Sequence, residues 1–393
     1  MRQIRCKSWL LAAVIIICMG AVGSAAELDL TAKAALLMDA DSGQIFYELN
    51  IDEPLPVASI SKLMTLVLVL EALNDGKVAL ADLVTTSEYA ASMGGSQVWL
   101  EPGEQLTLEE MLYAIAVGSA NDAAVAAAEY LAGSESAFAS LMNQRARELG
   151  LIHSEYSNAS GLPPTLLGLG GRQVMSARDV AELARHALTV PRLLEFVSTY
   201  EYTMRSNSTK KPVLWNNNKL LRRYQGVDGL KTGFTTEAGY CIAATAKRDE
   251  LRLIAVVLGS SSEASRESDI TKLLDYGFRE YTTHLVIPKQ TAVGEIMIPK
   301  GIPEKVNVVV SRDFYVTVKR GEQAQITTEV SIDDSLPVPL TTDISVGKIT
   351  AYLKDQPVAE MELKPEVAIE RASIPDLLIR IYQKMLLLLT EGS

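Results

Sequence analysis

A serine and a lysine stand three residues apart where a long apolar stretch of the chain begins. The motif Ser59-Ile60-Ser61-Lys62 precedes Leu63–Leu73, which is apolar almost all round, as in a helix buried in a core. This spacing places the Ser59 hydroxyl and the Lys62 amine one turn apart on one face of a helix. Burial makes a lysine easier to deprotonate, and an uncharged amine can take the proton of a serine hydroxyl, which is otherwise a poor nucleophile. The motif therefore indicates a serine nucleophile with a lysine base.

The same Ser-x-x-Lys pattern occurs twice more, at Ser208–Lys211 and at Ser345–Lys348. Both copies lie in stretches typical of loops or strands, and neither opens a long apolar helix. Context therefore favours Ser59 as the nucleophile.

Two other short motifs carry polar side chains suited to acyl transfer. Ser119-Ala120-Asn121 lies between two expected helices, although a serine that caps a helix would give the same letters. Lys231-Thr232-Gly233 is consistent with a strand at the edge of a cleft. There, a cation, a hydroxyl and a glycine that lets a substrate backbone approach would suit a peptide with a free carboxylate. A solvated lysine on an edge strand is the alternative for this motif.

The elements that must position these motifs indicate an α+β fold, with one antiparallel sheet covered by helices. Strands are expected at both ends of the first 284 residues and helices between them. The expected hairpins are Ala35–Asp39 with Gln44–Tyr47, and Tyr240–Lys247 with Leu251–Val257; the expected helices are three between Leu106 and Leu149, one from Ser176, and one over Ile270–Tyr281.

The amino-terminal segment has the order of a secretory signal peptide. Arg2, Arg5 and Lys7 precede the apolar stretch Trp9–Val22, which small residues follow. We expect residues 1–26 to direct export and to be removed, so that the mature protein works outside the cytoplasm. An uncleaved membrane anchor is the alternative, because the apolar stretch is only slightly shorter than a membrane span.

The remaining chain divides into three predicted parts. Residues 27–284 hold the motifs, and residues 285–372 show short alternating apolar runs between Pro and Gly, which predicts a small all-β domain. Residues 373–393 form an expected amphipathic helix, with Leu377, Leu378 and Ile381 at helical spacing. Such a helix suits attachment to a membrane surface, and packing on the β domain is the alternative.

Composition excludes several classes of function. A formal charge of −11 without a basic block argues against a nucleic-acid partner. The three histidines have no metal-ligand spacing, so we expect no metal and no cofactor. Cys241 is the one cysteine outside the expected signal peptide and is interpreted as a small buried strand residue.

Taken in order, Ser59-x-x-Lys62, Ser119-x-Asn121 and Lys231-Thr232-Gly233 resemble the motifs of β-lactamases and penicillin-binding proteins. The whole chain, from signal peptide to terminal helix, is similar to low-molecular-mass penicillin-binding proteins, the serine-type D-alanyl-D-alanine carboxypeptidases of the bacterial cell wall. This resemblance implies a β-lactamase/transpeptidase-like catalytic domain. It also implies that the chain removes the terminal D-alanine from peptidoglycan stem peptides, that β-lactams acylate it, and that it is attached to the outer face of the cytoplasmic membrane.

The resemblance also implies roles for individual residues. Ser59 would attack the carbonyl of the penultimate D-alanine, Lys62 would act as general base, and Ser119 would help to pass a proton to the leaving amine. The implied binding residues are Asn121, for the substrate amide and for holding Lys62; Lys231, Thr232 and Arg266, for the terminal carboxylate; Gly233 in the cleft strand; and the N–H of Phe234, with that of Ser59, for the oxyanion. The string Asn158–Leu162 resembles a loop that lines the cleft, and it receives no catalytic role.

Two alternatives remain open at this point. A class A β-lactamase shares the motifs, but it needs a Glu-x-x-Leu-Asn loop, and no such string lies between Asn121 and Lys231. The chain could also be a non-catalytic cell-wall-binding protein that keeps the fold, although all the motif side chains are present.

Overall fold

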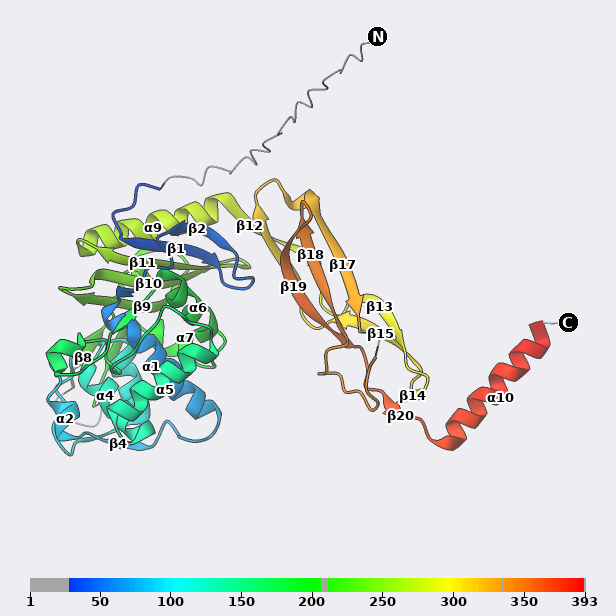
Figure 1. Ribbon diagram of the computed structural model, residues 1–393, viewed down its shortest axis with the longest axis horizontal. Helices are drawn as coiled ribbons and strands as arrows, with labels where there is room; N and C mark the ends of the chain where they lie inside the picture. Colours follow the sequence, from blue (N-terminus) through cyan, green and yellow to red (C-terminus); the bar gives the residue numbers. More distant parts are fainter. Residues whose placement is uncertain (1–27, 206–210, 334, 392–393) are drawn as a thin grey trace, which may run out of the picture.

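The computed structural model describes residues 28–205, 211–333 and 335–391. The expected export signal at residues 1–26 and Ser208 of one additional Ser-x-x-Lys motif lie outside these ranges. The expected α+β architecture is confirmed, with two parts joined in series and a helix at the carboxyl end (Figure 1).

The first part is built on a five-stranded antiparallel sheet with the order β2-β1-β11-β10-β9. Residues of β1 alternate between two cores: Leu36 and Met38 belong to the core shared with α1 and α3–α6, whereas Leu37 belongs to the core shared with α9. Helix α9 and the helices of the first core cover opposite faces of the sheet (Figure 1). The strands are β1 (Ala34–Asp39), β2 (Ile45–Leu49), β9 (Val227–Thr235), β10 (Gly239–Arg248) and β11 (Leu251–Ser260). Both expected hairpins are therefore confirmed, and the Lys231 motif lies on the edge strand β9.

Several helices of this part begin where a polar side chain accepts from one of their first N–H groups, whereas α1 and α4 have no such side-chain cap. Thr107 forms a capping box with Glu110, and the Ser134 and Ser176 hydroxyls accept from main-chain N–H groups one turn later. The main helices are α1 (Lys62–Asn74), α3 (Leu108–Ala116), α4 (Asn121–Ala132), α5 (Glu135–Glu148), α6 (Ala177–Ala187) and α9 (Glu263–Glu280). The shorter elements are β3 (Leu55–Pro56), η1 (Ala58–Ser61), β4 (Leu83–Thr85), α2 (Glu88–Ala91), β5 (Gln105–Thr107), η2 (Pro164–Leu167), β6 (Val174–Met175), α7 (Leu193–Val197), β7 (Glu201–Thr203), β8 (Val213–Trp215) and α8 (Leu220–Arg223).

The start predicted for helix α9 from the sequence was wrong. Helix α9 begins at Glu263 and not at Ile270, because the Ser262 hydroxyl accepts from the N–H of Ser265 at 3.0 Å and caps it. The first two turns are polar, so they lack the apolar period by which a helix is recognised in a sequence. Arg266 consequently lies on the first turn of α9.

The second part is all β, as expected. A five-stranded sheet with the order β13-β15-β19-β18-β17 packs on the pair β12-β16 around Val308, Phe314 and Leu363. Its elements are β12 (Tyr281–Ile287), β13 (Ala292–Met297), β14 (Gly301–Ile302), β15 (Lys305–Val310), β16 (Phe314–Lys319), η3 (Gln323–Gln325), β17 (Ile326–Ile332), β18 (Gly347–Leu353), β19 (Gln356–Pro365) and β20 (Glu370–Arg371). The predicted boundary after residue 284 falls inside β12, and Lys348 of the third Ser-x-x-Lys motif lies on β18.

Polar contacts join the two parts. The Thr317 hydroxyl on β16 donates to the buried Asp39 carboxylate on β1 at 2.7 Å, and Arg320 donates to the carbonyl of Phe278 at 3.1 Å.

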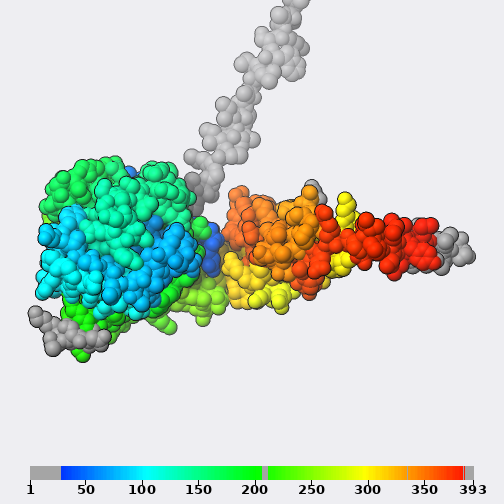
Figure 2. Space-filling model, turned by 90° about the horizontal axis from the view of Figure 1, so that it is seen from below, coloured from blue at the N-terminus to red at the C-terminus, as the bar shows by residue number. Residues whose placement is uncertain are grey.

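Beyond the β domain, α10 (Ile374–Glu391) continues away from the first part (Figures 1 and 2). Within the described ranges, no helix is long and apolar enough to cross a membrane.

Candidate active site

The predicted nucleophile and base meet at the amino end of α1. Ser59 lies in the 3-10 turn η1, directly before α1, and Lys62 is the first residue of α1. The Lys62 Nζ lies 3.1 Å from Ser59 Oγ, and the lysine side chain is fully buried. The preceding residue, Ala58, has a φ of 49°, a strained left-handed conformation of the kind that gathers at functional sites.

The Lys62 amine has two further partners, and both can only accept hydrogen bonds from it. It donates to Asn121 Oδ1 at 2.5 Å and to the carbonyl of Ser160 at 2.5 Å. Burial, and next the charge of Lys231, lower the pKa of Lys62 well below 10.5, against the opposing effect of Asp122 and Glu135. An uncharged amine uses its two hydrogens on these two acceptors. Its lone pair is then free to accept the proton of the Ser59 hydroxyl.

A buried loop, residues 158–162, presents the Ser160 carbonyl to Lys62. The fully buried Asn158 side chain shapes this loop, because its Oδ1 accepts from the N–H of Gly161 at 2.7 Å and from the N–H of Ser160 at 3.1 Å. The buried Glu135 carboxylate accepts from the N–H of Ala159 at 3.0 Å, and burial raises the pKa of this carboxyl. The loop that received no role from the sequence thus supplies a ligand of the predicted base.

Two glycines allow the loop and strand β9 to touch the turn of the nucleophile. A Cβ on Gly161, whose φ is 82°, would lie 2.1 Å from the carbonyl oxygen of Ala58. A Cβ on Gly233 would lie 2.5 Å from the carbonyl oxygen of Val57 and 3.1 Å from the Ser59 nitrogen. The close approach at Gly233 is therefore made by the protein's own main chain, whereas the sequence interpretation assigned it to the substrate. Phe234, which follows, lines the same cleft as Ser59.

Ser119 and Lys231 form the second pair of polar side chains. The Lys231 amine donates to Ser119 Oγ at 2.9 Å and to the carbonyl of Thr232 at 3.2 Å. Burial, and then the charge of Arg266, lower the pKa of Lys231 to about 7. Ser119 has a φ of 57° in the loop before α4. A proton can therefore pass between the Ser119 hydroxyl and an amine that exchanges protons near neutral pH.

Asn121 and Asp122 fix the loop that faces the nucleophile. The Asn121 amide nitrogen donates to the carbonyl of Gly94 at 2.6 Å while its oxygen accepts from Lys62. The fully buried Asp122 carboxylate accepts from the N–H groups of Val98 at 3.0 Å and Leu100 at 3.1 Å. No role was assigned to Asp122 from the sequence. The available signal was an acid in the otherwise apolar run of α4, because a buried carboxylate must find donors.

A cleft of about 250 Å³ joins the predicted residues into one site. Phe234 is 52% exposed at its edge and packs against Tyr240, with ring centroids 4.3 Å apart. The residues that line the cleft are Ser59, Ser96, Ser119, Asn217, Thr232, Gly233, Phe234, Tyr240, Glu263 and Arg266. Lys62, Asn121 and Lys231 lie buried and are linked to the cleft through Ser59 and Ser119. In the described parts of the chain, no group of three or more potential ligand side chains could hold a metal ion.

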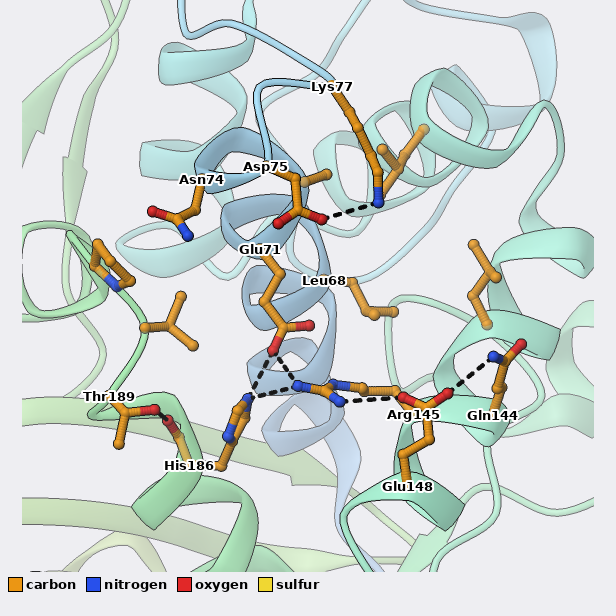
Figure 3. A pocket seen from close by; sticks show the side chains of 15 residues that line it. Leu68, Glu71, Asn74, Asp75, Lys77, Gln144, Arg145, Glu148, His186 and Thr189 are labelled. Carbon is orange, nitrogen blue, oxygen red and sulfur yellow. Dashed lines mark hydrogen bonds and ion pairs between the residues drawn. The ribbon is translucent and has the colours of Figure 1, made fainter. Parts of the chain in front are cut away.

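A larger cavity, of about 620 Å³, lies at the opposite end of α1 (Figure 3). Its central carboxylate, Glu71, accepts from Arg145 at 2.6 Å and lies 2.7 Å from His186 Nε2. On the cavity walls, Lys77 pairs with Asp75 at 2.9 Å (Figure 3). Because these charges are paired with one another, the cavity has the chemistry of a structural ion-pair cluster.

The sheet, the Ser59–Lys62 pair and the cationic far wall of the cleft define a serine hydrolase of the β-lactamase/transpeptidase-like class. The chain belongs to the peptidase S11 family of D-alanyl-D-alanine carboxypeptidases, whose model matches residues 21–262. A second model, the C-terminal domain of penicillin-binding protein 5, matches residues 281–371.

Individual relatives agree with this assignment. D-alanyl-D-alanine carboxypeptidase DacF of Bacillus subtilis is 40% identical over 342 residues, which are 86% of each chain. The crystal structure of penicillin-binding protein 5 from Haemophilus influenzae has a TM-score of 0.72 at 29% identity and covers 88% of this chain and 99% of its own. Penicillin-binding protein D2 from Listeria monocytogenes, solved in an ampicillin-bound form, is 33% identical, with a TM-score of 0.58 over 64% of this chain and 99% of its own.

The protein is therefore a D-alanyl-D-alanine carboxypeptidase, a serine hydrolase of cell-wall metabolism. This result supports the main interpretation of the sequence over a class A β-lactamase and over a non-catalytic wall-binding protein. The roles of the individual residues are a separate question.

Proposed function

We propose that the carboxypeptidase reaction runs through an acyl-enzyme on Ser59. The Ser59 oxygen attacks the carbonyl carbon of the penultimate D-alanine while its proton passes to Lys62. The C–N bond then breaks, the leaving D-alanine amine receives a proton through Ser119, and the acyl group stays on Ser59 as an ester. Water hydrolyses this ester and restores the hydroxyl.

One observation carries this proposal: the buried Lys62 amine has two acceptor partners and one hydroxyl partner. An ammonium could donate to all three oxygens, but burial lowers the pKa of Lys62 well below 10.5, and the uncharged amine has a lone pair that can accept the Ser59 proton. The amine is thus prepared as a base before substrate binds.

The far wall of the cleft suits the free carboxylate of the substrate. Lys231 and Arg266 supply positive charge, and the Thr232 hydroxyl, with the residue 5% exposed, supplies a donor at the surface of the cleft. The main-chain N–H groups of Ser59 and Phe234 would bind the oxyanion. In this arrangement the carboxylate fixes the position of the peptide, and Asn121, whose side-chain oxygen binds Lys62, would offer the remaining hydrogen of its amide nitrogen to the substrate amide.

β-Lactams carry an acyl group and a carboxylate in a similar arrangement, so we expect them to acylate Ser59. The ampicillin-bound form of the Listeria relative supports this expectation. The acyl-enzyme with penicillin would persist and can be observed directly.

The test is labelling with a fluorescent penicillin together with D-alanine release from a diacylated D-Ala-D-Ala peptide. Ser59→Ala is expected to abolish both signals. Ser345→Ala, in the third Ser-x-x-Lys motif, is the matched control and should keep both, since Ser345 lies in the β domain and donates to the carbonyl of Gly347. Labelling of a folded Ser59→Ala variant would refute the assignment of the nucleophile.

We also propose that residues 1–26 export the protein and that α10 attaches it to the outer face of the cytoplasmic membrane. Ile374, Leu378, Ile381 and Met385 share one face of α10 and are each at least 57% exposed. On another face, Arg380 donates to the carbonyl of Gly301 at 2.6 Å. The helix is thus tied to the β domain through Arg380 while its apolar stripe stays uncovered, which favours a membrane surface over packing on the β domain.

Deletion of residues 374–393 tests the attachment. The truncated protein is expected in the soluble fraction after cell lysis, with peptide hydrolysis unchanged, whereas the full chain should sediment with membranes. A truncated protein that still sediments would place the anchor elsewhere, most simply at an uncleaved amino terminus.

A further inference from the structure

Arg266 lies in the cleft with hydrogen-bonding capacity that the protein does not use. It is 4% exposed, and its Nε is buried without a partner in the described structure. Its nearest acidic oxygens are Glu263 Oε1 at 3.6 Å and Glu267 Oε1 at 4.0 Å, both beyond hydrogen-bond distance. A buried guanidinium with two acids near it would normally bind them directly, because a buried charge is costly unless it is paired and hydrogen-bonded.

Each of these acids is held instead by a second cation from the segment around α8. Lys219 lies 2.8 Å from Glu263 Oε1, the same oxygen that faces Arg266. Arg223 lies 3.1 Å from Glu267 Oε2. Both acids are thereby bound at positions from which they do not reach Arg266.

The segment that carries these cations is fixed by two buried asparagines. Asn218 donates to the carbonyl of Gly229 on β9 at 3.1 Å, and Asn216 donates to the carbonyl of Thr199 at 3.0 Å. Lys219 follows directly, so its position is fixed relative to the strand that carries the Lys231 motif. Asn216 and Asn218 are at most 6% exposed. These buried hydrogen bonds hold the main chain directly before Lys219 in a fixed position.

We propose that Lys219, with Arg223 in a supporting role, is a positioning residue that keeps Glu263 away from Arg266 and so leaves the guanidinium free for the terminal carboxylate of the substrate. The inference rests on the role proposed above for Arg266. Glu263 lines the same cleft, so without Lys219 its carboxylate would compete with the substrate for Arg266 and would repel the incoming anion.

The effect should fall on substrate binding and not on the chemical step. Lys219→Gln is expected to raise the KM for a diacylated D-Ala-D-Ala peptide about fivefold with kcat unchanged, the size typical of a half-exposed charge pair. Glu263→Gln removes the competing acid and should lower the KM. The double variant should return the KM to near the wild-type value, because the acid that Lys219 restrains is then absent.

Arg222→Gln is the matched control. It removes one positive charge from the same helix, but Arg222 lies over the ring of Tyr200 and 3.9 Å from Glu201, away from the cleft residues. Its KM should stay at the wild-type value, which separates a specific effect from a general loss of positive charge. Thermal unfolding of every variant checks that the fold is retained.

Arg266→Gln separates failure of the inference from failure of the proposed function. A large rise of KM in Arg266→Gln, combined with an unchanged KM in Lys219→Gln, would overturn the inference and leave the role of Arg266 intact. An unchanged KM in Arg266→Gln would overturn both. A KM that stays high in the double variant would also overturn the inference, because the loss would then not act through Glu263.

Discussion

The two ends of helix α1 carry charged clusters of opposite design. At the amino end, the Lys62 amine is fully buried and touches only neutral oxygens, those of Ser59, Asn121 and Ser160. About two and a half turns later, Glu71 is about a quarter exposed and binds Arg145 and His186 directly (Figure 3). One helix thus presents a lysine without an ion-pair partner at one end and a carboxylate with two close partners at the other.

The difference shows what each cluster can do. Burial among neutral oxygens lowers the pKa of the Lys62 amine, so this group can lose its proton and then accept the proton of Ser59. A carboxylate paired with a guanidinium joins the helices that carry the two groups, as Glu71 on α1 does with Arg145 on α5. The smaller cleft is therefore reactive, and the larger cavity is structural.

The largest expected effect comes from removing the base. Lys62→Met keeps a long apolar stem but supplies no lone pair, so acylation by a fluorescent penicillin should slow about a thousandfold. The rate of labelling measures this, and thermal unfolding verifies that the variant is folded. Lys348→Met, in the third Ser-x-x-Lys motif, should label at the wild-type rate, since Lys348 is exposed and pairs with Glu360. Fast labelling of folded Lys62→Met would show that Lys62 is not the base, and the amino end of α1 would then not be the reactive end.

The sequence predicted the side chains of this site because each motif lies on a recognisable element. Ser59 precedes an apolar helix, and Lys231 lies on a strand with the spacing of a known family, so their meeting in one cleft could be expected. The Ser160 carbonyl could not be predicted, because every residue has a carbonyl and only the fold determines which one is presented. The string Asn158–Leu162 matched a loop of the family, but the role of Asn158 could not be predicted, because its partners are main-chain groups of its own loop.

The fold was predicted wrongly where the first turns of a helix are polar. The start of α9 has no apolar period, and it was therefore placed seven residues too late, beyond Arg266. The prediction for Gly233 was also wrong: the sequence interpretation attributed this glycine to the close approach of a substrate backbone. Its contact with Val57 depends on how β9 packs on η1, which no local pattern contains.

A second prediction concerns the stability cost of the reactive end. Burial lowers the pKa of Lys231 from 10.5 to about 7. Below pH 7 both the folded and the unfolded chain carry this proton, so burial of the charged amine lowers the free energy of unfolding by its full amount. Between pH 7 and 10.5 the unfolded chain binds more protons, so stability rises with pH. The shift corresponds to about 5 kcal/mol at most. Lys231→Met removes this cost but also loses the bonds to Ser119 and Thr232, each worth about 1 kcal/mol.

We therefore expect Lys231→Met to be more stable than the wild type by about 2 kcal/mol at pH 7, while losing activity. The gain should shrink and then reverse as the pH approaches 10. Urea unfolding of both proteins at pH 7, 8.5 and 10 measures the difference. A gain that is the same at every pH would mean that Lys231 is not buried as a cation, and a variant less stable than the wild type at pH 7 would contradict the prediction outright.

The smallest effect is expected at the structural end. Glu71→Gln keeps the shape of the side chain but removes the charge shared by Arg145 and His186, so the free energy of unfolding should fall by about 1 kcal/mol. Arg145 keeps Glu148 at 3.1 Å as a partner, which limits the loss. Penicillin labelling and peptide hydrolysis should stay at wild-type rates, because the changed group is about two and a half helical turns from the base. A marked loss of activity in a folded Glu71→Gln variant would show that α1 couples its two ends, and the separation into a reactive and a structural cluster would then be wrong.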